Sequence, residues 1–92
     1  DAVEFNTGKY SEAADEKEEN FYLERIEKAV DYALSKGIKA HVGHGLNYHN
    51  VQKLVRLNKI EEFNIGHAVV ARAVITGFEK AVKDMILLLS AR

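Results

Sequence analysis

The sequence predicts an α/β fold built on a three-stranded parallel sheet. Three short apolar runs, at residues 2–6, 38–42 and 61–65, are each followed by residues with helical spacing. Strands that alternate with helices pair in parallel through right-handed crossovers. Two of the runs lead into Gly-His segments, one containing His44 and the other Gly66-His67. Because α/β proteins place their chemistry at the carboxyl ends of parallel strands, we expect both segments on one side of the sheet.

The first unit begins with a strand at residues 2–6, and Thr7-Gly8 follows as a turn. The acidic stretch from Ser11 to Asn20 is expected to be a solvated loop or the start of a helix. Apolar residues then recur at three- and four-residue spacing from Tyr22 to Leu34, which predicts an amphipathic helix. Gly37 should end this helix in a left-handed cap.

The second unit has a strand at 38–42, a loop at 43–49 and a short helix that Asn50 is expected to cap. The inward face of that helix should carry Val51, Leu54 and Val55, with Leu57 as a further candidate.

The third unit has a strand at 61–65 and a helical stretch that runs from Gly66-His67 to the C-terminus. An interruption is expected near Thr76-Gly77, because glycine inside a helix costs about 1 kcal/mol. Beyond it we expect Met85 and Phe78 in the core, together with Tyr22 of the first helix.

A parallel sheet needs cover on both faces, and 92 residues supply barely enough helix for that. The open edges of the sheet should therefore seek partners.

Composition narrows the classes of function. Thirteen basic and fourteen acidic residues, with a net charge of −1, disfavour nucleic acid or an anionic membrane as partner. Cysteine is absent, and no apolar run approaches the roughly 20 residues that span a bilayer. We therefore expect one small cytoplasmic domain with a small-molecule partner.

His44 is the strongest candidate for proton transfer, because the flanking glycines leave its imidazole open to a ligand. The alternative is an ordinary turn histidine. His41, His44 and His49 together suggest a zinc site, but their spacing lacks the i, i+4 pair of helical zinc motifs, and no metal is expected.

Three further positions could bind a substrate or stabilise charge. Gly66-His67, at the start of a helix, offers unpaired N–H groups and the favourable end of the helix dipole to a phosphate. Thr7-Gly8 could bind an anion, although a simple turn is favoured. Glu4 lies in an apolar strand and is either buried, as an acid or an electrostatic partner, or faces outward; the sequence leaves both open.

Three blocks of this sequence together resemble the C-terminal part of the pyridoxine 5′-phosphate synthase family. They are Glu4-Phe5-Asn6-Thr7-Gly8-Lys9-Tyr10, Gly43-His44-Gly45-Leu46-Asn47-Tyr48-His49-Asn50-Val51, and Glu62-Phe63-Asn64-Ile65-Gly66-His67-Ala68 with Ala71-Arg72-Ala73. The resemblance extends over residues 1–92 and implies the last three β/α units, six to eight, of a (β/α)8 TIM barrel. It also implies a homo-octamer.

That family condenses 3-amino-2-oxopropyl phosphate with 1-deoxy-D-xylulose 5-phosphate, releasing phosphate and water, without a metal or an organic cofactor. The resemblance implies that His44 is the proton donor and that Glu4 stabilises charge. It also implies that Gly45, Gly66 and His67 contact a phosphorylated substrate.

One position departs from the family pattern, because Asn6 stands where the family usually has histidine. Asparagine keeps a hydrogen bond but cannot titrate near neutrality. The family's other catalytic and arginine residues belong to earlier strands, so the 92-residue chain alone is expected to be incomplete as an enzyme. The rival hypothesis is a non-catalytic partial barrel that binds phosphate or assembles with copies of itself.

Overall fold

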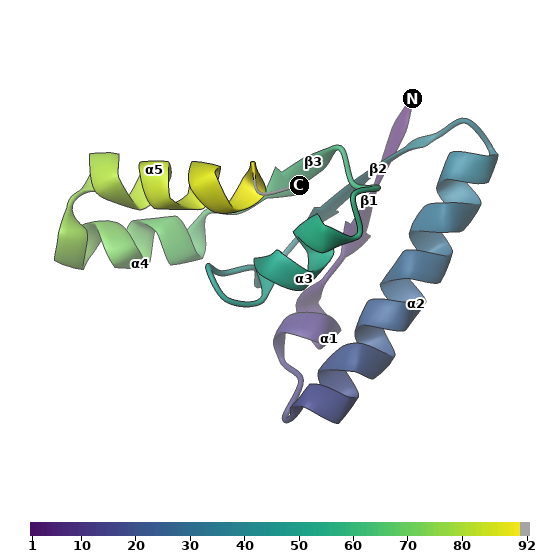
Figure 1. The fold of residues 1–92 in the computed structure, drawn as a ribbon, viewed down its shortest axis with the longest axis horizontal. Coiled ribbons are helices and arrows are strands. Elements are labelled where there is room, and N and C mark those ends of the chain that lie inside the picture. The colour runs from purple at the N-terminus through teal and green to yellow at the C-terminus, as the bar shows by residue number, and fades with distance from the viewer. Residues whose placement is uncertain (91–92) are drawn as a thin grey trace.

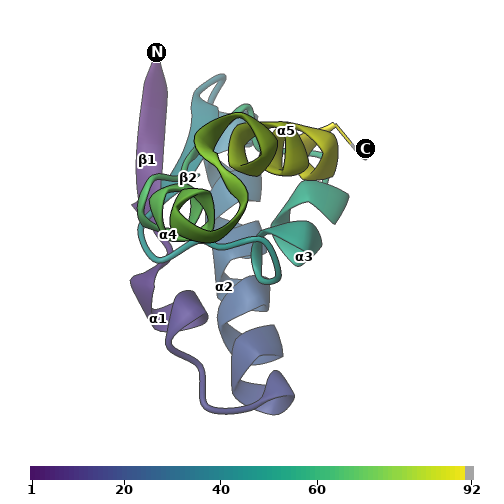
Figure 2. The same ribbon diagram turned by 90° about the vertical axis from the view of Figure 1, so that its left-hand side faces the viewer.

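The computed structural model describes residues 1–90, which form three strands and five helices. The strands are β1 (Ala2–Asn6), β2 (Lys39–Gly43) and β3 (Glu62–Asn64). They form one parallel sheet in the order β1-β2-β3. Figures 1 and 2 show the sheet with α2 (Glu16–Ser35) running beside it. The predicted three-stranded parallel sheet is confirmed, with boundaries shifted by one residue in β2 and β3.

The acidic stretch proves to be part loop and part helix. A single short turn, α1 (Gly8–Ser11), follows β1, and α2 begins only at Glu16. The Asp15 side chain accepts a hydrogen bond of 2.8 Å from the Glu18 N–H and so caps α2. Carboxylates in the first turn also favour this end of the helix dipole.

Gly37 ends α2 as predicted. Its φ is +73°, in the left-handed region that favours glycine, and its N–H donates to Leu34 O at 3.0 Å.

The short helix α3 (Val51–Arg56) buries Val51, Leu54 and Val55, as the spacing predicts. Asn50 occupies the N-cap position, but its side chain makes no capping bond, so that prediction is wrong. The carboxamide of Asn50 is used inside the preceding loop instead, where it contacts Asn47 and Gly45.

The last two helices, α4 (His67–Thr76) and α5 (Phe78–Leu89), pack against each other as a hairpin. The predicted break is confirmed at Gly77, whose φ is +90°. Residues 91 and 92, the end of the predicted helical stretch, lie outside the described residues.

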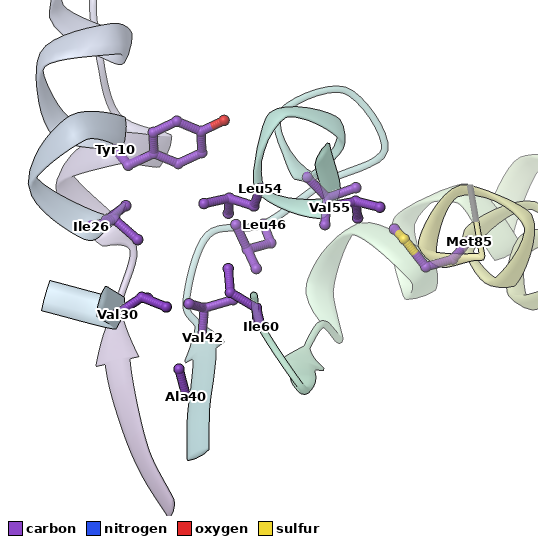
Figure 3. Packing of buried hydrophobic residues seen from close by; sticks show 11 residues of the cluster. Tyr10, Ile26, Val30, Ala40, Val42, Leu46, Leu54, Val55, Ile60 and Met85 are labelled. Atoms are coloured by element: carbon purple, nitrogen blue, oxygen red, sulfur yellow. The ribbon is translucent and has the colours of Figure 1, made fainter. Parts of the chain in front are cut away.

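The core lies between the sheet, α2, α3 and α5 (Figure 3). Met85 is buried as predicted, and Tyr22 packs against the core while partly exposed. The prediction for Phe78 is wrong, because its side chain is 66% exposed. Phe78 is the first residue of α5, and Figure 1 shows the turn between α4 and α5 at the end of the hairpin that lies far from the sheet.

The two faces of the sheet differ in character. Ala40 and Val42 of β2 are fully buried against the core. The alternate positions form a polar face, because successive side chains of a strand point to opposite sides. Its residues are Glu4, Asn6, Lys39, His41, Glu62 and Asn64. Because the side chains of this second face are polar, the face does not need an apolar layer packed against it.

Candidate functional site

A cleft of about 510 Å³ lies beyond the carboxyl ends of β2 and β3. One wall is the loop after β2, and the other is the start of α4. Four of the residues singled out in the sequence lie on this cleft: His44, Gly45, Gly66 and His67. The structure thus brings the two Gly-His segments together on one side of the sheet, which is the arrangement that a parallel sheet predicts.

His44 is exposed and has a strained backbone. Its φ of +94° lies in the left-handed region that L-residues rarely adopt. Gly45, the next residue, has a φ of +76°, and a Cβ there would lie 2.6 Å from the Cβ of Ser11. Glycine is therefore required at position 45 both by the backbone conformation and by the space available.

Two asparagines fix the loop that carries His44. The Asn47 side chain accepts from the N–H groups of His49 and Asn50, each at 2.8 Å. In return, the Asn50 side chain accepts from the Asn47 N–H at 2.8 Å. These side-chain-to-backbone bonds hold the loop in one shape.

Tyr10 stabilises the same loop through a buried hydrogen bond. Its side chain is 1% exposed, and its hydroxyl donates to the carbonyl of Asn50 at 2.5 Å. Burial raises the pKa of Tyr10 well above its usual value, and the nearby Glu19 carboxylate adds to this effect. The phenol is therefore a neutral donor over the whole physiological range.

The second wall is the amino end of α4. Gly66 is its N-cap residue, and the Gly66 carbonyl accepts from the Val70 N–H at 3.0 Å. The first N–H groups of a ten-residue helix have no intrahelical partners, which suits an anion. A Cβ built on Gly66 would meet no atom within 4 Å, so no protein contact requires glycine here.

Glu4 does not line the cleft. It is exposed on the polar face of the sheet, where the Asn64 carboxamide donates to one of its carboxylate oxygens. Gly43 lies between them, because a Cβ there would be 3.1 Å from Asn64 Cβ and 3.2 Å from Glu4 Oε2. Of the two alternatives that the sequence left open, these 92 residues show the exposed one. Glu4 nevertheless reaches the cleft through Asn64, which is one of its lining residues.

Sequence reasoning missed Asn64, together with the loop asparagine Asn47. Both line the cleft, and both belong to the blocks that carry the resemblance. Asparagine at the end of a strand or in a glycine-rich loop is a common turn residue, so the residue type alone gave no distinguishing signal.

Thr7 and Gly8 form a turn, and their donors are already used within the protein. The Thr7 N–H donates to Gly43 O at 2.9 Å, and the Gly8 N–H donates to Asn6 Oδ1 at 2.7 Å. The Thr7 side chain is fully buried. The alternative of an anion site at this turn is therefore not supported.

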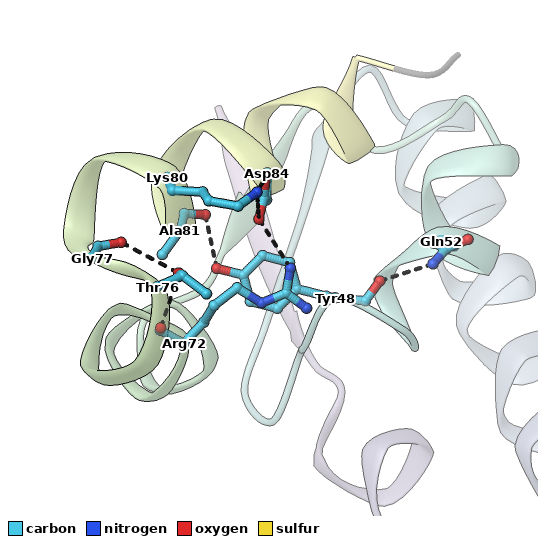
Figure 4. Close-up of polar contacts among 8 residues, drawn as sticks. All are labelled: Tyr48, Gln52, Arg72, Thr76, Gly77, Lys80, Ala81 and Asp84. Atoms are coloured by element: carbon cyan, nitrogen blue, oxygen red, sulfur yellow. Dashed lines mark hydrogen bonds and ion pairs between the residues drawn. The ribbon is translucent and has the colours of Figure 1, made fainter.

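A cluster of side chains joins the two walls of the cleft (Figure 4). The Tyr48 hydroxyl donates to Ala81 O of α5 at 2.8 Å. The guanidinium carbon of Arg72 lies 3.5 Å from the centroid of the Tyr48 ring, and Arg72 also pairs with Asp84 at 3.2 Å. A hydrogen bond from Lys80 is the largest cause of the lowered pKa of Asp84; Arg72 lowers it further, against partial desolvation.

The other histidines of the middle segment lie apart from this cleft wall. His41 is within 3.5 Å of a Glu62 carboxylate oxygen and 3.8 Å of a Glu61 oxygen, nearer the amino ends of the strands. Within residues 1–90, no group of three or more His, Cys, Asp or Glu side chains is placed to hold a metal ion. In the same range, none of the helices is long and apolar enough to cross a membrane.

Comparison with known proteins gives a consistent result. A family model described as "Pyridoxal phosphate biosynthesis protein PdxJ" matches residues 1–91. The chain is 49% identical over 86 residues to a pyridoxine 5′-phosphate synthase of Geobacter sulfurreducens, covering 94% of this chain and 36% of the relative. It is 50% identical over 94 aligned residues to the synthase of Aquifex aeolicus, covering 97% of this chain and 39% of that relative.

A third relative, the pyridoxine 5′-phosphate synthase of Magnetococcus marinus, is 49% identical over 83 residues, with 90% of this chain and 34% of the relative covered. The chain thus spans little more than a third of the length of these relatives. The similarity covers all three strands, both Gly-His segments and the cleft between them. From its sequence and these matches, the chain belongs to the PdxJ family of pyridoxal phosphate biosynthesis proteins.

Proposed function

We propose that this chain forms the phosphate-binding and proton-donating part of a pyridoxine 5′-phosphate synthase. The reaction condenses 3-amino-2-oxopropyl phosphate with 1-deoxy-D-xylulose 5-phosphate to give pyridoxine 5′-phosphate, phosphate and water, as the family resemblance implies. The observation that carries the proposal is one cleft that is lined both by a histidine, His44, and by the amino end of a helix, α4. A phosphorylated substrate that is protonated during ring closure needs both features.

Four of the cleft residues have a part in this proposal. A phosphate at the start of α4 would accept hydrogen bonds from the N–H groups after Gly66, beside His67. His44, on the opposite wall, would donate a proton to a departing or developing oxygen, a step typically worth 10²–10⁴-fold. Gly45 leaves room for the substrate between them, because no side chain projects from it.

Glu4 has the part of an electrostatic partner. A carboxylate on the polar face lies where positive charge on a substrate nitrogen could be stabilised, and Asn64 fixes its orientation. Asn6, level with Gly43 in the sheet, replaces the family histidine and contributes hydrogen bonding only.

The proposal includes the architecture that the resemblance implies. A sheet with one apolar and one polar face, with its strands in sequential parallel order, fits units six to eight of a (β/α)8 barrel whose interior holds the reaction. The homo-octamer and the cytoplasmic location remain predictions from the sequence. Transferase chemistry on small phosphorylated substrates follows from the proposed reaction.

The test is a chimeric enzyme. Residues 1–92 would replace the matching segment of the Geobacter sulfurreducens relative, which is 49% identical. We expect the chimera to form pyridoxine 5′-phosphate from the two substrates, measured by mass spectrometry, whereas the 92-residue chain alone forms none. A folded chimera without product, next to an active parent enzyme, would contradict the proposal and favour a non-catalytic partial barrel that binds phosphate.

A further inference from the structure

The turn after β1 contacts the backbone of His44 through hydrogen bonds to its carbonyl group. The Thr7 hydroxyl lies 2.8 Å from the carbonyl oxygen of His44 and 2.9 Å from that of Gly43, so its single hydrogen serves both. The Thr7 N–H also donates to Gly43 O. A second hydroxyl, that of Ser11, lies 3.3 Å from the His44 carbonyl. Thr7 and Gly43 are 36 positions apart in the sequence, so these are long-range contacts.

These contacts act on a strained position. A residue other than glycine with a φ of +94° persists only where its surroundings hold it there. The His44 carbonyl is the group whose direction changes if φ and ψ relax, and it is the group that the two hydroxyls bind. Thr7 is completely buried, so water does not replace its hydroxyl without disturbing the packing.

The same turn also contacts the imidazole ring. A Cβ built on Gly8 would lie 2.8 Å from His44 Cδ2, so the ring packs directly on the Gly8 backbone. The same Cβ on Gly8 would lie 2.9 Å from Asn6 Oδ1, which already accepts a hydrogen bond from the Gly8 N–H. The ring and the carbonyl of His44 are thus both held by residues 6–11, and none of these residues lines the cleft.

We propose that Thr7 is a positioning residue that holds His44 in its strained conformation, on the cleft that the start of α4 also lines. The effect of Thr7 on kcat rests on the proposed function above, whereas its effect on the conformation of His44 does not. Thr7 does not itself line the cleft, and it acts on His44 through the carbonyl groups of Gly43 and His44.

The kinetic experiment compares Thr7→Val, which keeps the shape and removes the hydroxyl, with Thr7→Ser, which keeps the hydroxyl. In the chimeric enzyme, Thr7→Val should lower kcat at least about tenfold and change KM for either substrate by less than about twofold. Thr7→Ser should recover kcat to within about threefold of the parent. Equal activity of the two variants, or a change confined to KM, would overturn the proposal.

The conformational experiment needs no turnover. In the 92-residue chain, NMR signals of the His44 imidazole, assigned with His44→Asn, should shift and broaden in Thr7→Val, while those of His67 stay in place. Thr76→Val, at an exposed threonine, is the matched control and should move neither set. Unchanged His44 signals in Thr7→Val would exclude the positioning role even if the chimera is active.

A third variant covers the case in which Thr7→Val does not fold. Ser11→Ala removes the exposed hydroxyl that lies 3.3 Å from the His44 carbonyl, and Thr7→Ser keeps the hydroxyl at position 7. Ser11→Ala should shift the His44 signals in the folded chain, and Thr7→Ser should leave them close to those of the parent. The reverse order would overturn the proposal, and an inactive chimera with shifted His44 signals would reject the proposed function but not this positioning role.

Discussion

The Arg72 guanidinium stacks on the ring of Tyr48, with 3.5 Å between the guanidinium carbon and the ring centroid (Figure 4). Tyr48 belongs to the loop that carries His44, and Arg72 belongs to the helix that begins beside Gly66. One contact between two side chains therefore links the two walls of the cleft. Asp84 of α5 pairs with the same guanidinium and keeps it over the ring.

Removing this contact should cost stability. We expect Arg72→Ala to lower the free energy of unfolding by about 1 kcal/mol, since cation–π contacts contribute about 0.5–2 kcal/mol. A double-mutant cycle with Tyr48→Leu, measured by urea denaturation, should give a coupling energy of at least about 0.5 kcal/mol. Arg25→Ala is the control, because Arg25 lies 5.7 Å from the exposed Phe21 ring. Additive effects of Arg72→Ala and Tyr48→Leu would show that the stacking contributes nothing.

His44→Asn tests the proposed role of His44 as the proton donor. Asparagine tolerates the positive φ of position 44 better than most residues, so the loop should keep its shape. In the chimeric enzyme, kcat should fall by about 10²–10⁴-fold while KM changes little. His49→Asn, a change in the same loop at a residue away from the cleft, should retain most of the rate. Parallel losses in kcat and substrate affinity would instead identify His44 as a binding residue.

Glu4→Gln tests the carboxylate. Glutamine still offers an oxygen to the Asn64 amide, so the change removes the charge but not the hydrogen bond. We expect a fall in kcat of at least about tenfold, or roughly 1.4 kcal/mol, with the protein fully folded. An unchanged rate would show that the Glu4 charge takes no part in the reaction.

Gly43→Ala tests the same pair without altering either partner. Its Cβ would lie 3.1 Å from Asn64 Cβ and 3.2 Å from Glu4 Oε2, so both side chains must move apart. We expect Gly43→Ala to lower the rate, as Glu4→Gln does. The loss of activation free energy in the double variant should be smaller than the sum of the losses in the two single variants. Strict additivity would mean that Gly43 acts on another part of the site.

Local patterns predicted the strands and helices because their causes are local. Gly37 and Gly77 end or break helices through their own φ angles, and the apolar spacing of α2 marks one buried face. The prediction for Phe78 is wrong because its burial depends on how far the α4–α5 hairpin extends beyond the sheet, which helical spacing does not encode.

The sequence predicts which residues gather at the cleft but not how they are connected. His44 and Gly66 line one cleft, as their places after two parallel strands predict, and glycine beside histidine is visible in the sequence. The Glu4–Asn64 hydrogen bond joins residues 60 positions apart, and the contact of Thr7 with the His44 carbonyl depends on the register of β1 with β2. Asn50 has the residue type and the position of a helix cap, yet the backbone N–H of Asn47 binds its side chain instead.

Alkaline pH should destabilise the fold through Tyr10. Its pKa is raised in the folded protein by burial, so the unfolded chain loses the phenolic proton first, from about pH 10 upward. The stabilising effect is fully present below pH 10 and is lost as the pH rises further, by up to about 1.4 kcal/mol per pH unit. Urea denaturation at pH 8, 10 and 11 should show a smaller loss in Tyr10→Phe than in the parent. Tyr32→Phe, at a side chain that is 67% exposed, should follow the parent.

The last prediction concerns Gly66, at the start of α4. The φ of Gly66 is −134°, outside the left-handed region, and a Cβ there would touch no protein atom, so neither strain nor packing explains the glycine. The phosphate proposed above would explain it if bound close to the first N–H groups of α4, because a side chain would occupy the space of the phosphate oxygens. Gly66→Val should therefore weaken binding of 3-amino-2-oxopropyl phosphate to the chimeric enzyme at least about tenfold, or roughly 1.4 kcal/mol, in calorimetric titration. Gly66→Ala should give a smaller loss, and thermal unfolding should show both variants folded. If folded Gly66→Val binds the substrate as tightly as the parent does, the start of α4 is not part of the phosphate site, and the His44 loop alone must hold the substrate.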